Sequence, residues 1–161
     1  MPTAVYAGSF DPVTLGHLDI IRRSAEIFDH LIVAVADNPD KHAAFTVEER
    51  MEMLREITGD ISHVEVLHAT GLTVDFARAH GATCLVRGMR TAVDFEAERE
   101  LAQINQAIAP EIETFFLAAR PEHTHVSSSA VRQMAAFGCS LSGFVPDCLE
   151  ARILRRLQHS K

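Results

Sequence analysis

Five short apolar segments alternate along the chain with stretches of helical periodicity, and this alternation limits the possible folds more than any other feature. The segments are rich in branched and aromatic residues and are bounded by turn formers; they cover residues 3–7, 30–36, 63–69, 82–88 and 113–119. Most have continuous rather than alternating hydrophobicity, which is typical of strands covered on both faces.

Helices are predicted between and after these strands. Apolar residues recur at spacings of three and four in two of the stretches, at Leu18, Ile21, Ala25 and Phe28, and at Val93, Ala97, Leu101, Ile104 and Ile108. Such spacing places them on one face of a helix. The stretch 46–57 opens with Thr46 followed by Glu49, the pattern of a capping box. Two further helices are expected over 127–137 and 146–158, the second amphipathic with a solvated basic face.

Strands that alternate with helices predict a doubly wound α/β fold: a Rossmann-like, five-stranded parallel sheet with helices on both faces. No repeat, low-complexity stretch or long linker divides the chain, so residues 1–161 are expected to form a single domain. In such sheets ligands bind at the carboxyl ends of the strands. The loops that follow the strands are therefore the places to search for function.

Composition excludes several functions. The net charge is −7, with 22 acidic and 15 basic side chains, which argues against nucleic-acid and membrane partners because both need a positive field. No apolar run approaches the roughly 18 residues of a membrane span, and no signal peptide is visible. The three cysteines form no CxxC pair, which favours a reducing, cytoplasmic location.

The loop after the first strand, "GSFDPVTLGH" (8–17), has the features of a phosphate site. Gly8 ends the strand without a side chain, so that a ligand can approach the backbone closely. Gly16 lets the start of the following helix pack close to a ligand. His17 is then in the first helical turn, where free N–H groups and the helix dipole favour phosphate. GxGxxG and GxxxxGK motifs are absent, which excludes a dinucleotide-dependent oxidoreductase and a P-loop.

This loop resembles the (T/H)xGH signature of the nucleotidyltransferase superfamily. The threonine at its first position is Thr14. Together with "FTVEERMEML" (45–54), "LVRGMRTAVDFEAERELAQIN" (85–105) and "VSSSAVR" (126–132), it makes almost the whole chain similar to one branch of that superfamily. Members of this branch reversibly transfer an adenylyl group from ATP to 4′-phosphopantetheine, giving dephospho-coenzyme A and pyrophosphate. The resemblance implies direct in-line attack without a covalent intermediate.

The resemblance also implies roles for individual residues. His17, Lys41 and Arg90 match the catalytic positions. Substrate-binding positions match Ser9, Lys41, Thr73 and Arg87. ATP-binding positions match Ser9, Phe10, His17, Gly88, Met89, Arg90, Glu98, His123, Thr124, His125, Val126, Ser127, Ser128 and Ser129. Ser127–Ser129 should also cap a helix.

The resemblance implies Mg²⁺ with the ATP, a homohexamer, and inhibition by coenzyme A. No metal ligands are expected from the protein itself, since His123 and His125 lack a third partner. Three alternatives stay open at this point: adenylyl transfer to nicotinate mononucleotide, cytidylyl transfer to a sugar or glycerol phosphate, and a nucleotide-binding module that has lost catalysis.

Overall fold

A computed structural model of the protein describes residues 2–38 and 42–158. Within these residues, five parallel strands form one sheet in the order β3-β2-β1-β4-β5. The strands are β1 (Thr3–Gly8), β2 (His30–Ala36), β3 (Val64–Ala69), β4 (Cys84–Met89) and β5 (Glu113–Ala118). All five predicted strands are confirmed, with boundaries shifted by at most two residues. The chain order reverses between β1 and β4, which is where such sheets bind ligands.

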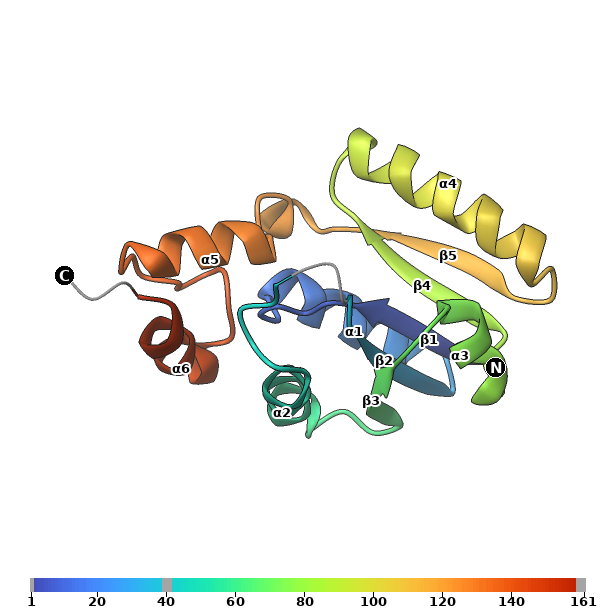
Figure 1. The fold of residues 1–161 in the computed structure, drawn as a ribbon, viewed down its shortest axis with the longest axis horizontal. Helices are drawn as coiled ribbons and strands as arrows, with labels where there is room; N and C mark the ends of the chain where they lie inside the picture. The colour runs from blue at the N-terminus through green and yellow to red at the C-terminus, as the bar shows by residue number, and fades with distance from the viewer. Residues whose placement is uncertain (1, 39–41, 159–161) are drawn as a thin grey trace.

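Helices cover both faces of the sheet, as predicted (Figure 1). One face carries α1 (Leu15–Ile27) and α2 (Val47–Thr58), and α5 (Ser128–Ala136) and α6 (Asp147–Leu157) extend the same apolar cluster beyond the ends of the strands. The other face carries α3 (Thr73–Ala79) and α4 (Ala92–Ile108). A single-turn 3₁₀ helix, η1 (Pro121–His123), follows β5. No helix was specified from the sequence over the residues of α3, because seven residues are too few to show helical periodicity.

Two apolar layers hold the helices on the sheet, because neighbouring strand residues point to opposite faces. Tyr6 and Val33 belong to the layer under α1, α2, α5 and α6. Val5 and Ile32 belong to the layer under α3 and the end of α4. The continuous hydrophobicity of the central strands is thus explained by burial on both sides.

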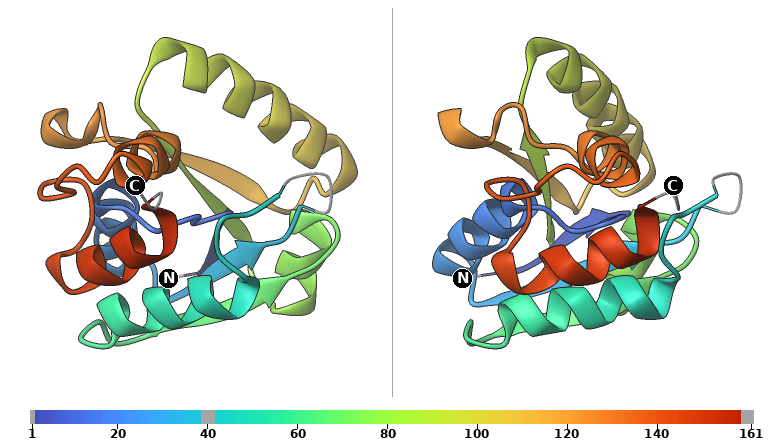
Figure 2. Two further views of the ribbon diagram at one scale, coloured as in Figure 1. Left: turned by 60° about the vertical axis from the view of Figure 1, so that its left-hand side comes forward. Right: turned by 90° about the vertical axis from the view of Figure 1, so that its left-hand side faces the viewer.

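Helix α6 packs beside α2 (Figure 2) and contributes Leu149 and Ile153 to the core. Its basic face was expected to be solvated. Two of its arginines instead pair with α2 carboxylates, Arg152 with Glu52 at 2.9 Å and Arg156 with Glu49 at 3.1 Å. In the described part of the chain no helix is both long and apolar enough to cross a membrane.

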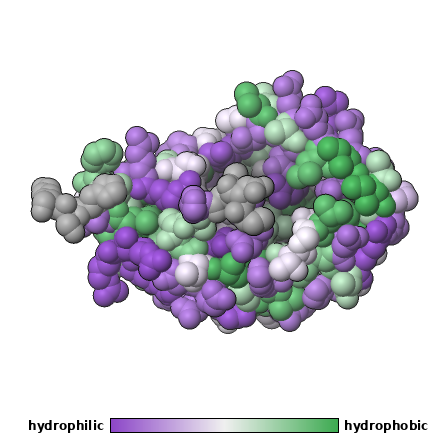
Figure 3. Space-filling view, viewed as in Figure 1, coloured by the Kyte–Doolittle hydropathy of each residue, from purple (hydrophilic) through white to green (hydrophobic). Residues whose placement is uncertain are grey.

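Helix α4 differs from the other α-helices because it has no buried residue. The predicted helix is present, but none of its residues is buried in the single chain, and Val93 at its start is 77% exposed. Leu101, Ile104 and Ile108 are also exposed, and so is Phe115 on the neighbouring edge strand β5. These residues contribute to an apolar surface over α4 and β5 (Figure 3). Periodicity correctly predicted an apolar face but not that the chain leaves it uncovered.

Candidate active site

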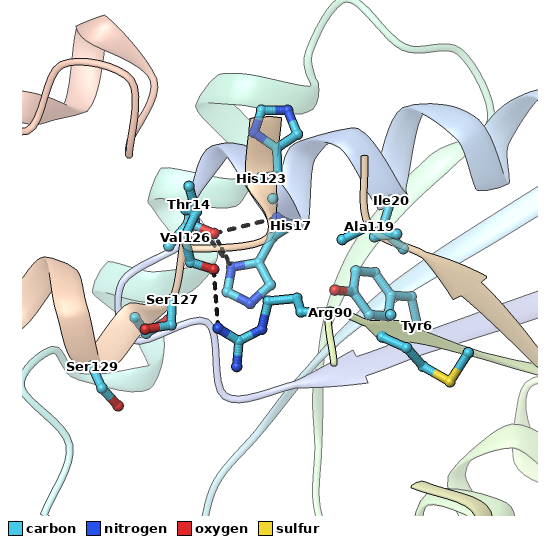
Figure 4. Close-up of a pocket in the computed structure, with 14 residues that line it drawn as sticks. Tyr6, Thr14, His17, Ile20, Arg90, Ala119, His123, Val126, Ser127 and Ser129 are labelled. Carbon is cyan, nitrogen blue, oxygen red and sulfur yellow. Dashed lines mark hydrogen bonds between the residues drawn. The ribbon is translucent and has the colours of Figure 1, made fainter. Parts of the chain in front are cut away.

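A pocket of about 280 Å³ lies at the point where the strand order reverses. Its walls come from the loops that follow β1, β4 and β5, and no carboxylate lines it among the described residues. The lining residues are Tyr6, Thr14, Gly16, His17, Ile20, Gly88, Met89, Arg90, Ala119, His123, Val126, Ser127, Ser128 and Ser129 (Figure 4). Nine of the predicted site residues are therefore brought together in one cavity: His17, Gly88, Met89, Arg90, His123, Val126, Ser127, Ser128 and Ser129.

His17 is oriented by the residue that caps its own helix. Thr14 is the N-cap of α1, and its hydroxyl accepts a hydrogen bond from the backbone N–H of His17 at 3.3 Å. In return, the backbone N–H of Thr14 donates to Nδ1 of His17 at 3.0 Å, and the Thr14 hydroxyl lies 3.1 Å from the same nitrogen. This reciprocal capping box fixes the plane of the imidazole ring.

The same contacts fix the protonation of His17. Because Nδ1 accepts from the Thr14 N–H, the proton of the neutral ring is on Nε2. Burial, and after it the positive charge of Arg90, lowers the pKa of His17 from 6.5 to about 4. His17 is therefore neutral at physiological pH and presents a single N–H donor. Figure 4 shows its ring beside the Arg90 side chain.

Arg90 supplies the positive charge of the pocket. It follows the end of β4, and its guanidinium donates to the carbonyl of Val126 at 3.5 Å and pairs with Asp94 at 3.4 Å. These contacts join the loop after β4 to the loop after β5. A guanidinium and a neutral N–H donor side by side suit a phosphate group.

Ser127–Ser129 begin α5, as predicted, and their hydroxyls have partners. The Ser127 hydroxyl accepts from the N–H of Ala130 and caps the helix. Ser128 donates its hydroxyl to the carbonyl of Pro12 at 2.8 Å. The Ser129 hydroxyl accepts from Arg132 at 3.3 Å. What this segment offers an anion is the free N–H groups of the first helical turn.

Phe10 and Ser9 have different surroundings although they are adjacent. Phe10 has a φ of 49°, and its ring is 2% exposed, packed edge-on against Tyr6 and His17. Only its main chain could face a nucleotide. Ser9 is exposed and lines a second cavity of about 240 Å³, which shares Ser128 and Ser129 with the first.

The predicted binding residues Arg87 and Glu98 bind each other. Two hydrogen bonds of 2.6 and 2.7 Å join the guanidinium to the carboxylate, and Arg87 also donates to the carbonyl of Ala7. The pair thus ties α4 to the ends of β4 and β1, and neither residue lines the first pocket.

Three other predicted residues lie outside this pocket. Thr73 begins α3 after β3, on the far side of the reversal point. Thr124 is exposed and bonds to the carbonyl of Pro121, while exposed His125 packs against the Phe144 ring. Lys41 lies outside the described residues.

The sequence analysis missed several polar residues of the two pockets. Tyr6 on β1 reaches the first pocket, and burial raises the pKa of its hydroxyl, which keeps it protonated. Arg132 on α5 lines the second pocket and donates to the carbonyl of Asp11 at 2.6 Å. Arg50, 2% exposed, donates to the carbonyls of Ser9 and Ala36. Arg132 had a signal in the sequence, because it is one helical turn after Ser128 and Ser129.

One buried polar atom in the first pocket is without a partner. The Nδ1 atom of His123 makes no hydrogen bond with any described residue, although it is shielded from solvent. A buried nitrogen of this kind is costly unless a ligand or water pairs with it. No group of three or more His, Cys, Asp or Glu side chains that could hold a metal is found among residues 2–38 and 42–158.

The cytidylyltransferase-like family matches residues 5–134 of the chain. The Plasmodium falciparum nicotinic acid mononucleotide adenylyltransferase, solved with NaAD, has the same fold, with a TM-score of 0.68 at 15% identity over 95% of this chain and 94% of that one. The fold and the pocket at its reversal point therefore define a nucleotidyltransferase.

Similar proteins of known name show which kind of nucleotidyltransferase the chain is. The phosphopantetheine adenylyltransferase of Symbiobacterium thermophilum is 52% identical over 153 residues, which cover 95% of this chain and 94% of the relative. The enzyme of the same name from Caldanaerobacter subterraneus is 46% identical over 160 residues, which cover 99% of this chain and the whole relative. The chain belongs to the phosphopantetheine adenylyltransferase family.

Proposed function

We propose that the protein reversibly transfers the adenylyl group of ATP to 4′-phosphopantetheine, giving dephospho-coenzyme A and pyrophosphate. Family membership supports the reaction, and one observation in the pocket carries the proposal. The Thr14 N–H occupies Nδ1 of His17, so a neutral imidazole directs Nε2–H into a pocket that also contains Arg90. A fixed N–H donor beside a cation suits the pentavalent phosphorus of an adenylyl transfer.

The attacking group needs little activation by the protein. A phosphate monoester has a second pKa of about 6, so it is largely dianionic near neutrality. Its oxygen forms a bond to the α-phosphorus of ATP, while the bond from that phosphorus to the bridging oxygen breaks and pyrophosphate leaves with the electron pair. No carboxylate base lines the pocket among the described residues, and a dianionic phosphate needs none for the direct in-line attack proposed here. Catalysis then consists of positioning and charge stabilisation.

The remaining phosphates of ATP would extend from the first pocket into the second. The two pockets meet at Ser128 and Ser129, where the N-terminus of α5 provides N–H groups and the positive end of a helix dipole. Arg132 lies one turn further along the same helix and lines the second pocket. This path gives pyrophosphate a cationic environment as it leaves.

Magnesium would enter with the nucleotide. The first pocket offers hydroxyls, N–H groups and a guanidinium, which suit phosphate oxygens better than a metal ion. Asp11 lines the second pocket, but both of its carboxylate oxygens accept backbone N–H groups, from Ala44 at 2.8 Å and Phe45 at 2.9 Å. Mg²⁺ bound through the phosphates would neutralise part of their charge.

Three further parts of the proposal concern the enzyme in the cell. The exposed apolar face of α4 supports assembly of several copies, and the family resemblance implies a homohexamer. Coenzyme A contains the phosphopantetheine and adenine groups of the product, so it would compete for the same site. All three cysteines are free thiols, which agrees with a reducing cytoplasm.

Steady-state kinetics of His17→Ala tests this proposal. Loss of one transition-state donor should lower kcat by roughly 10²- to 10³-fold, while the affinity for ATP changes far less. Pyrophosphate release with Mg²⁺-ATP and 4′-phosphopantetheine measures kcat, and calorimetry measures ATP binding. A variant that binds ATP poorly but turns over normally at saturation would contradict the assigned role.

A further inference from the structure

Asp19 is nearly buried and is held between two arginines. Its side chain is 11% exposed, and it lies on α1, two residues after His17. One carboxylate oxygen is 3.0 Å from Nη1 of Arg23, and the other is 3.1 Å from Nε of Arg120. The same nitrogen of Arg23 donates to the carbonyl of Ala118 at 2.9 Å. Asp19 thus links α1 to the end of β5 and to the loop that follows it.

That loop, residues 119–127, forms one wall of the pocket. Ala119, His123, Val126 and Ser127 line the cavity, and Figure 4 shows the first three around His17. Its turns are internally bonded, since the N–H of His123 donates to the carbonyl of Arg120 at 2.8 Å and the N–H of Val126 to that of His123 at 3.0 Å. A displacement of Arg120 would therefore be passed on to Val126.

The loop also lies beside the start of α1, at Gly16, where a side chain as small as a methyl group would still fit. A Cβ atom at Gly16 would be 3.9 Å from both Cβ of His123 and the carbonyl oxygen of Val126. The loop therefore contacts α1 near its start, at Gly16, and again one turn later, through Asp19. The first contact is only van der Waals, whereas the ion pairs with Asp19 are polar contacts between α1 and the loop. On its other side the loop is held by Arg90, which donates to the carbonyl of Val126.

We propose that Asp19 is a positioning residue, which fixes loop 119–127 against α1 and so forms the nucleotide pocket before ATP binds. The inference rests on the proposed function, because it assumes that this pocket takes ATP. Removal of the Asp19 charge leaves the partly buried Arg23 without its carboxylate and releases the exposed Arg120, so the loop loses its ionic attachment to α1. A loop released from α1 would spend only part of its time in the binding-competent position, and apparent affinity falls by that fraction.

Two variants test the attachment from its two sides. Asp19→Asn removes the charge without a large change in shape, and Arg120→Gln removes the loop's cation at a more exposed position, where misfolding is not expected. We expect each to raise both the KM and the Kd for ATP about tenfold, which corresponds to a tenfold smaller competent fraction. kcat at saturating ATP and the KM for 4′-phosphopantetheine should change little. The double variant should be no worse than either single variant.

Arg22→Gln is the matched control, since Arg22 is also on α1 but pairs with Asp60 at the surface. It should leave all the constants unchanged. Normal ATP affinity in folded Asp19→Asn and Arg120→Gln would overturn the inference, as would an equal loss in kcat and in both KM values. Wild-type protein that binds no ATP would instead contradict the proposed function, and this inference with it.

Discussion

At the scale of single residues, the proposed mechanism depends on a histidine, His17, that carries no charge at neutral pH. Thr14 occupies one nitrogen of the His17 ring, and burial together with Arg90 opposes a second proton. Arg90 provides the positive charge instead. The neutral ring can therefore donate a hydrogen bond at a phosphorus centre. It adds no second positive charge beside Arg90.

The protonation of His17 can be measured directly. Its pKa of about 4 lies below the ordinary 6.5, so the unfolded chain takes up this proton first as the pH falls. His17 should therefore lower the free energy of unfolding between about pH 6.5 and pH 4, and above that range its contribution should be constant. NMR of the imidazole should show no titration between pH 8 and pH 5. Titration near pH 6.5 would contradict the assignment, and His17→Gln identifies the resonance.

At the scale of elements, two helices begin with a capping box, but the two boxes have different roles. Thr46 and Glu49 form a capping box at α2 that only starts a helix. The capping box of α1 uses Thr14 and His17, so the cap that starts the helix also orients the histidine of the proposed active site. Binding loops at the carboxyl ends of strands are thus positioned by helix starts as much as by the sheet.

A pair of matched substitutions separates these two roles. Thr14→Val and Thr46→Val each remove a capping hydroxyl and should each lower stability by about 1 kcal/mol. Only Thr14→Val should also lower kcat, by roughly 10- to 100-fold, because a small misplacement of His17 is costly. Urea denaturation and pyrophosphate release give the two quantities. Equal activity in the two variants would show that the Thr14 hydroxyl does not help to align His17.

The elements also show what the sequence could and could not predict. The strands were predictable because burial on both faces leaves continuous apolar runs, and the site loops because parallel strands end at a common edge. The place of Tyr6 in the site was not predictable, because in the sequence it looks like any other core residue. Only the packing shows that its hydroxyl reaches the pocket. The mutual pairing of Arg87 and Glu98 depends on how α4 lies over β4.

At the scale of the whole molecule, the sheet order places three loops around one pocket. It also leaves the apolar face of α4 exposed in the single chain. The apolar residues of α4 have the spacing of a core helix, yet they face solvent in the single chain. Periodicity reports that a face is apolar, but it does not distinguish the chain's own core from an interface between copies.

This face should be required for assembly. Leu101→Asp and Ile104→Asp place a charge on it and should convert the assembly into smaller species, whereas Gln106→Asp, at a polar position of the same helix, should not. Sedimentation velocity of each variant measures the mass. A wild-type protein that remains monomeric at micromolar concentration would contradict the proposed assembly.

The most direct test of the account compares acceptors. Pyrophosphate release would be measured with Mg²⁺-ATP and either 4′-phosphopantetheine or nicotinate mononucleotide, and with CTP and glycerol 3-phosphate as a further control. Release is expected with 4′-phosphopantetheine alone, and it should be roughly 10²- to 10³-fold slower in His17→Ala. Release with another acceptor would contradict the substrate assignment. ATP binding without release from any pair would contradict catalysis itself and identify a nucleotide-binding module.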